Sequence, residues 1–191
     1  MGKYISQYKQ MDFVGDMTIH HIDHIKELIG LTDSKSLLDF GCGGGQQYKD
    51  PVNLQKDLGI KPALYDPGVD AYEKLPWGTF DGVYSTDVME HIPKEELPDA
   101  LEIIFYKAKK FVFLAICTAP AFRRLPNGEN AHCTIEPISF WKDIVEQYRP
   151  SNILTHIKTY GPPSIGAVSY THLRAHETLR YRVCRLLLEK K

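Results

Sequence analysis

The chain has 191 residues, of which 43% are hydrophobic and 25% are charged, and its net charge at pH 7 is −1. This length fits one domain at roughly 150 residues each, and the composition is that of a soluble globular protein. The charge disfavours a nucleic-acid or membrane-surface partner, and no run reaches the ~18 apolar residues that a membrane span needs.

The cysteines and the N-terminus bear on the cellular compartment. Cys42, Cys117, Cys133 and Cys184 show no paired spacing, and residues 1–10 lack the apolar core of a signal peptide. We therefore expect reduced thiols and a cytoplasmic protein without membrane association. Cys42 and Cys117 are interpreted as small structural residues, because the sequence places no base beside either of them.

Two stretches near the C-terminus stand apart from the rest: Val168–Thr178 reads VSYTHLRAHET, and Val183–Lys191 reads VCRLLLEKK. Both resemble a sequencing-library adapter translated in one frame, with its variable index over Leu179–Arg182. We therefore expect a domain over residues 1–167 that is truncated before its native C-terminus, and a non-native tail over residues 168–191. Without the tail's six basic and two acidic residues, the net charge is −5.

Short apolar segments alternate with helical patterns in the first half of the chain. Met17–Ile29 carries isoleucines at helical spacing, and Gly30 suits the C-terminal cap of this helix. The glycines of Gly41–Gly45 predict a turn. Three strands are expected, over Ser36–Phe40, Ala63–Tyr65 and Phe80–Thr86.

The second half continues this alternation. A helix is predicted over Lys94–Lys109, and the unbroken apolar run Phe111–Ile116 is typical of a strand covered on both faces. A long polar loop over Ala119–Glu136 leads to a helix over Pro137–Tyr148, and a strand over Asn152–Tyr160 follows. Alternating strands and helices predict an α/β fold, with a mostly parallel sheet and helices on both faces.

The sequence LLDFGCGGG over Leu37–Gly45 has the layout of a nucleotide-binding turn, with a buried strand, an acid and then glycines. Glycines let a ligand approach the backbone, and the amides that follow offer donors. Asp66 ends the next predicted strand after this turn, where a carboxylate can accept hydrogen bonds from a ribose. The G-x-G-G-G spacing disfavours a dinucleotide dehydrogenase. A plain glycine turn and a turn-forming Asp-Pro-Gly are the alternatives.

LLDFGCGGG, YDP and FDGVYSTDVMEHIP, within about residues 13–160, together resemble the small, type-11-like class I S-adenosylmethionine (SAM)-dependent methyltransferases. The resemblance implies a Rossmann-like sheet, SAM as the cofactor, and six cofactor-binding residues: Asp39, Gly41, Gly43, Asp66, Asp87 and Val88. The glycines would line the methionine part and Asp66 would hold the ribose. Asp87 and Val88 would lie near the sulfonium, a cation to which Asp39 is also suited, directly or through water.

The chain departs from this family between Asp66 and Phe80, where a short connection replaces a helix and a strand with an adenine-contacting acid. Val69–Trp77 holds at most one short strand or turn, so we expect the sheet to be trimmed at that edge. Asp70 and Glu73 are both candidates for the adenine contact. The family's final antiparallel strand, next to the last predicted strand, would fall beyond the truncation.

Two histidines are candidate general bases for methylation of an oxygen or a nitrogen. His91 follows Glu90 just past a strand end, and His132 lies in the long loop that ends at the same edge. A helix-capping His91 and a solvated His132 are the alternatives. The resemblance also implies that the N-terminal segment, with Tyr4, Tyr8 and Phe13, covers the cofactor or the acceptor, ordinary packing being the alternative.

Two other functions stay open. Asp87-x-x-Glu90-His91 with a distant His132 offers ligands for a divalent metal. With Asp in place of the first Glu, it resembles the E-x-x-E-H plus His arrangement of small-RNA 3′-terminal 2′-O-methyltransferases. Ubiquinone-type O-methyltransferases share E-x-x-E-H, and the net charge of −5 argues against RNA. We therefore assign no metal ligand and expect a small-molecule acceptor. The second alternative is a SAM-binding module without turnover.

Overall fold

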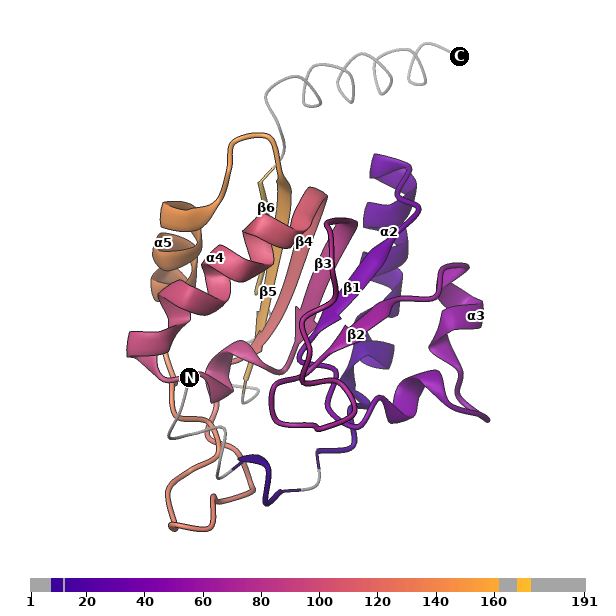
Figure 1. Cartoon of the computed structure of the whole chain (residues 1–191). Coiled ribbons are helices and arrows are strands. Elements are labelled where there is room, and N and C mark those ends of the chain that lie inside the picture. The colour runs from indigo at the N-terminus through magenta and orange to yellow at the C-terminus, as the bar shows by residue number, and fades with distance from the viewer. Residues whose placement is uncertain (1–7, 12, 162–167, 173–191) are drawn as a thin grey trace.

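A six-stranded sheet in the order β2-β1-β3-β4-β5-β6 forms the centre of the computed structural model, which describes residues 8–11, 13–161 and 168–172 (Figure 1). The first five strands in this order are parallel, and β6 runs antiparallel to β5. Their bounds are β1 Leu37–Phe40, β2 Ala63–Tyr65, β3 Phe80–Thr86, β4 Ala108–Cys117, β5 Leu154–Tyr160 and β6 Val168–His172. This is the Rossmann-like α/β fold that the sequence predicts.

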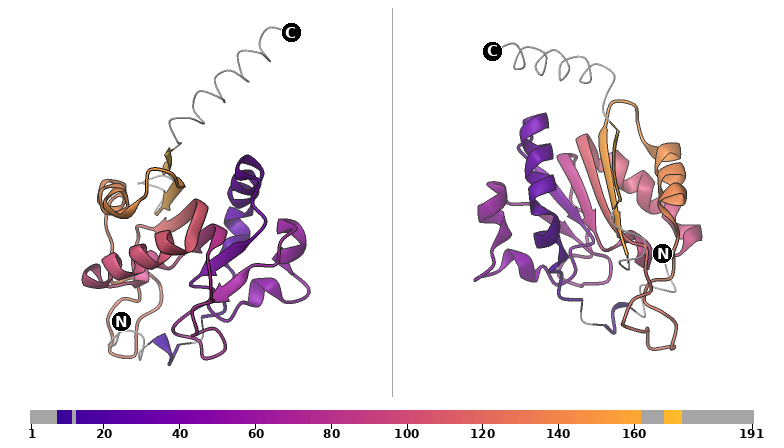
Figure 2. Two further views of the ribbon diagram at one scale, coloured as in Figure 1. Left: turned by 45° about the horizontal axis from the view of Figure 1, so that its top comes forward. Right: turned by 180° about the vertical axis from the view of Figure 1, so that it is seen from behind.

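Helices cover both faces of the sheet. One face carries α2 (Ile22–Thr32) and α3 (Leu54–Leu58), and the other carries α4 (Leu97–Lys107) and α5 (Ile138–Tyr148) (Figures 1 and 2). Single turns of 3-10 helix occur at η1 Met17–His21, η2 Gln46–Tyr48, η3 Met89–His91 and η4 Lys94–Glu96. In the described parts of the chain, no helix combines the length and apolarity needed to cross a bilayer.

The core is divided in two by β4, whose side chains alternate between the faces. Phe111 and Phe113 pack with Ile25 of α2, whereas Val112 and Leu114 join the cluster under α4 and α5. All four of these β4 residues are fully buried. An apolar run without polar alternation is therefore explained by a strand that has helices on both sides.

Several helix boundaries differ from the sequence prediction, among them the start of α4, which begins at Leu97 after the separate turn η4. The residues expected to start the first helix form the separate turn η1, and α2 runs past Gly30 to Thr32. The cap is Asp33 at φ 45°, whose amide donates to the carbonyl oxygens of Gly30 and Ile29; aspartate tolerates this left-handed conformation. The predicted end of α4 at Lys109 is wrong because residue 108 already pairs with β3.

The sheet is trimmed at β2, which is its three-residue edge strand. Residues 69–77 form turns and no strand, as predicted. At the opposite edge, β6 occupies the position where a final strand was expected to be missing, and its residues come from the predicted tail. An unpaired strand edge attracts any extended segment, so this pairing is compatible with either origin of residues 168–191.

We predict that a chain ending at Gly166 is as stable as the full chain, with a free energy of unfolding within about 0.5 kcal/mol, as for neutral surface changes. The reason is that an adventitious strand has no side-chain partners selected for it. Urea denaturation of both chains measures the difference. A loss of several kcal/mol on truncation would mean that β6 is an integral strand, and would contradict the adapter interpretation.

Candidate functional site

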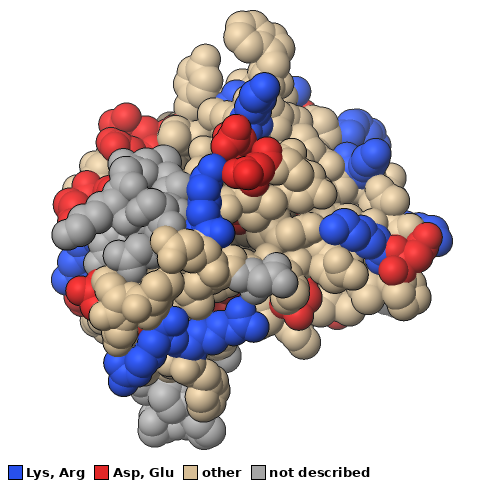
Figure 3. Space-filling model, turned by 60° about the horizontal axis from the view of Figure 1, so that its bottom comes forward, with Lys and Arg blue, Asp and Glu red and all other residues tan. Residues whose placement is uncertain are grey.

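Loops that follow three parallel strands meet at the carboxyl edge of the sheet, at the bottom of Figure 1. They are Gly41–Gly45 after β1, residues 87–91 after β3 and residues 118–137 after β4. Residues 13–16 of the N-terminal segment lie at the same edge. Lys and Arg side chains and Asp and Glu side chains are both spread over this side of the molecule, and several of the basic ones adjoin one another at the lower left of the view (Figure 3). Ligands of open α/β sheets bind outside this edge.

The glycine turn is bound to the end of β2 through Asp66. The amide of Gly43 donates to Oδ2 of Asp66 over 2.7 Å, and the amide of Gly68 donates to Oδ1 over 2.8 Å. Burial raises the pKa of this carboxyl group, while the two amides act in the opposite direction. The Asp-Pro-Gly turn therefore exists, and it also fixes the carboxylate against the glycine loop.

Gly41 is required by its surroundings. Its φ is +90°, and a Cβ atom there would lie 2.3 Å from a methyl group of Val88. Two of the predicted cofactor residues, Gly41 and Val88, are thus in direct contact across the ends of β1 and β3. Only glycine lets the two strand ends approach this closely.

The amides at the end of the glycine turn and just after it have partners within the chain. They donate to carbonyl oxygens of the N-terminal segment, in the pairs Gly44 to Phe13, Gln46 to Val14 and Gln47 to Gly15. The expectation that these amides are open to a ligand is therefore not met in this structure. The N-terminal segment packs on the glycine loop, while its expected cover of the cofactor or the acceptor stays a prediction, and Tyr4 lies outside the described residues.

Asp39 belongs to an internal polar network. It is 1% exposed, and its Oδ2 accepts hydrogen bonds from the Tyr48 hydroxyl at 2.6 Å and from the Gln47 amide at 3.2 Å. The Tyr48 hydroxyl also lies 2.6 Å from that of Tyr84. Burial raises the pKa of Asp39 to about 7. Sequence reasoning missed Tyr48 and Gln47, because neither lies in a recognisable motif.

The residues after β3 include two acids, of which Asp87 is partly buried and Glu90 is fully buried. Asp87 adopts a φ of 56°, and its amide donates to the carbonyl oxygen of Ala115 on β4. Burial, with a smaller contribution from Asp16, raises the pKa of Asp87 to about 7. Glu90 is fully buried, and burial raises its pKa well above the usual range. Within the described residues, Oδ2 of Asp87 and Oε2 of Glu90 have no hydrogen-bond partner.

His91 is held in an aromatic pocket of the N-terminal segment. Its Nδ1 lies 2.9 Å from the Tyr8 hydroxyl and 2.8 Å from the carbonyl oxygen of Ala131, and the rings of Tyr8 and Phe13 pack against it. A carbonyl oxygen only accepts hydrogen bonds, so this contact places the ring proton on Nδ1 and leaves a lone pair on Nε2. Burial lowers the pKa of His91 to about 4, which keeps it neutral.

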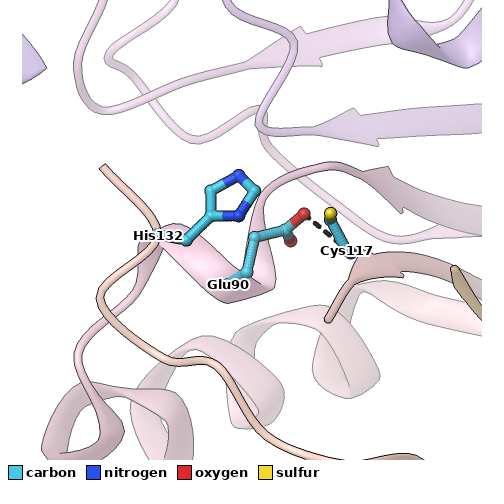
Figure 4. Close-up of side chains that lie close together, drawn as sticks. All are labelled: Glu90, Cys117 and His132. Carbon is cyan, nitrogen blue, oxygen red and sulfur yellow. Dashed lines mark hydrogen bonds between the residues drawn. The ribbon is translucent and has the colours of Figure 1, made fainter. Parts of the chain in front are cut away.

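The loop after β4 brings His132 to the same place. Its ring lies edge-on to that of His91, with centroids 4.6 Å apart, and its Nδ1 contacts the carbonyl oxygen of Ala119. One imidazole nitrogen of His132, the Cys117 sulfur and a Glu90 carboxylate oxygen all lie within 4.8 Å of one another (Figure 4). The interpretation that no base lies beside Cys117 is therefore wrong.

The sequence suggested Asp87, Glu90, His91 and His132 as possible metal ligands, but the described residues form a different cluster. Glu90 and His132 come together, but with Cys117 in place of Asp87 and His91. A cysteine at a strand end is a weak sequence signal, since its two partners lie far from it in the chain, one on each side. The pairing of β3 with β4 brings Glu90 to Cys117, and the return of the loop after β4 brings His132 to both.

The two candidates for an adenine contact lie at the surface. Asp70 and Glu73 both form ion pairs with Lys9, with N–O distances of 2.8 and 3.2 Å. The side chain of Asp70 is 88% exposed, so this pair contributes little to stability. The two ion pairs join the turn after β2 to the N-terminal segment.

Comparisons of the chain with protein-family models, with curated proteins and with solved structures find no match. The function is therefore inferred from the residues of the site.

We predict that Gly41→Ala destabilises the protein by about 1–3 kcal/mol more than Gly59→Ala, because it adds a clash with Val88. Gly59 is the matched control: its φ is +67°, and a Cβ atom there meets nothing within 4 Å. Both variants share the cost of a left-handed backbone, about 1–2 kcal/mol. Urea denaturation measures the difference, and equal losses would show that Gly41 and Val88 do not pack as described.

Proposed function

We propose that the protein is a SAM-dependent methyltransferase that acts on an oxygen or nitrogen atom of a small-molecule acceptor. The observation that carries this proposal is the link between the glycine loop and Asp66 at the carboxyl edge. The two backbone amides use one lone pair on each oxygen of Asp66. A carboxylate has about four acceptor positions, so Asp66 can still accept hydrogen bonds from two ribose hydroxyls.

Asp87 suits the positive end of such a cofactor. It is mostly buried, and within the described residues its Oδ2 has no hydrogen-bond partner. A cation nearby would favour the ionised carboxylate and so offset the cost of burial. SAM, when bound, supplies a methyl group activated by its sulfonium charge. Asp39 would act on this charge only through Tyr48, Gln47 or water, because it is enclosed by the protein.

His91 suits the acceptor side of the site. It stays neutral at physiological pH, and its Nε2 lone pair can take a proton from the acceptor's hydroxyl or amine as the methyl group is transferred. His132 packs against its ring and helps to fix it. The protein's main contribution is alignment of the acceptor, which can supply ~7–11 kcal/mol of barrier reduction.

The mixed charges at the carboxyl edge favour a small acceptor over RNA (Figure 3). Binding to a phosphate backbone relies on clustered Lys and Arg side chains.

A SAM-binding module without turnover differs from an enzyme in one measurable respect, which is transfer of the methyl group.

We predict that Asp66→Asn weakens SAM binding by about 10- to 150-fold, equivalent to 1.5–3 kcal/mol for hydrogen bonds to a charged group. Isothermal titration calorimetry measures the affinity, and thermal melting confirms that the variant is folded. Asp57→Asn is the matched control, because this exposed acid of α3 belongs to no part of the candidate site and should leave the affinity unchanged. Unchanged affinity in folded Asp66→Asn would refute the ribose assignment.

We predict that His91→Ala and His132→Ala lower turnover by about 10²- to 10⁴-fold, the usual range for acid–base groups, while SAM affinity changes little. Turnover is measured as tritium transferred from methyl-labelled SAM to compounds of a small-molecule extract. His20→Ala, at an exposed histidine of η1, serves as the control. Equal losses of binding and turnover would place the histidine in the cofactor pocket. Binding of SAM without any transfer by the unmodified chain would favour the non-catalytic alternative.

A further inference from the structure

Glu90 is a buried carboxyl group with an unsatisfied oxygen. It is 0% exposed, and its Oε1 accepts a hydrogen bond from the Cys117 amide at 2.8 Å. Its Oε2 is buried without a hydrogen-bond partner among the described residues, and no Lys or Arg among them forms an ion pair with it. A buried carboxyl group in this situation needs either a proton or a cation.

Two further metal-ligating side chains face this carboxyl group. They are the Cys117 thiol at the end of β4 and the His132 imidazole from the loop that follows, and the three ligand atoms lie within 4.8 Å of one another (Figure 4). Glu90 is buried, whereas Cys117 and His132 are each only partly buried. The three residues come from η3, β4 and the loop after β4, which are fixed by separate contacts.

We propose that Glu90, Cys117 and His132 form a Zn²⁺ site with an open fourth coordination position. Thiolate, imidazole and carboxylate are the ligands that zinc takes in proteins, and three protein ligands with one exchangeable position characterise catalytic zinc sites. The thiolate distinguishes this site from one for Mg²⁺ or Mn²⁺, which prefer oxygen ligands.

The required rearrangement is small. Zinc–ligand distances of about 2.0–2.3 Å put the ligand atoms of a tetrahedral site roughly 3.3–3.8 Å apart. The atoms must therefore approach by about 1 Å from their present limit of 4.8 Å, which side-chain rotation allows. The His91 ring and the Ala119 carbonyl oxygen already hold the His132 ring on this side of the loop.

Charge balance also favours the assignment. Binding displaces the thiol proton of Cys117 and any proton on Glu90, and both pass to solvent. One thiolate, one carboxylate and Zn²⁺ then form a neutral group. The fourth position takes water or an oxygen, nitrogen or sulfur atom of an acceptor. In the proposed enzyme this assigns His132 to the metal and leaves His91 as the base, but the metal site itself does not depend on SAM binding.

The test uses the full chain with Cys184→Ser in every sample, so that only Cys42, Cys117 and Cys133 contribute thiols. After chelator treatment, Co²⁺ is added as a spectroscopic substitute for Zn²⁺. We expect one equivalent to bind, with a thiolate-to-cobalt charge-transfer band and the visible bands of tetrahedral Co²⁺. One equivalent of Zn²⁺ should remove both signals and raise the melting temperature.

Cys117→Ser should abolish the charge-transfer band, and His132→Gln and Glu90→Gln should weaken Co²⁺ binding at least tenfold. Cys133→Ser is the matched control: this half-buried thiol lies 3.8 Å from the carbonyl oxygen of Glu90 but is not in the cluster, so its band should persist.

His132 lies on a loop, so His132→Gln is expected to fold even if a variant of the buried Glu90 does not. The test then still has one ligand variant that can be measured. A folded chain without the cobalt bands, or a band that survives Cys117→Ser, would overturn the proposal. SAM affinity, measured on the same samples, tests the proposed function separately.

Discussion

Because β3 pairs in parallel with both β1 and β4, the loops that follow these three strands all lie at one edge of the sheet. The register places Asp39 beside Tyr84 and Thr86 beside Ala115, so β1, β3 and β4 end at similar heights. The Asp87 amide continues the ladder by donating to the carbonyl oxygen of Ala115. Residues distant in sequence meet at this edge because the strands share a direction, which neither their own propensities nor the loops could impose.

Features set by local sequence were predictable, and features set by tertiary contact were not. The bounds of β2 and β3 follow from short apolar runs between turn residues, and the positions of Asp66 and Asp87 follow from those strand ends. The end of α4 could not be predicted, because it depends on residue 108 pairing with β3. The approach of Cys117 to His132 likewise depends on where a long loop returns.

The N-terminal segment connects parts of the site that the sheet leaves separate. Residues 13–15 accept hydrogen bonds from amides at the end of the glycine turn and just after it, while the Tyr8 hydroxyl lies against His91 and Ala131. Lys9 pairs with the two acids after β2. One segment thus contacts the loops after β1, β2, β3 and β4.

Four carboxyl groups gather near the carboxyl edge. Asp66 accepts one hydrogen bond from a backbone amide on each of its oxygens, whereas Asp39 accepts those of the Tyr48 hydroxyl and the Gln47 amide on Oδ2 alone. Asp39, Asp87 and Glu90 each keep one buried oxygen without a partner among the described residues. Burying such oxygens costs free energy that a bound cation recovers. The two proposals address two of these three atoms: a sulfonium suits Asp87, and Zn²⁺ suits Glu90, where a thiol and an imidazole complete the ligand set.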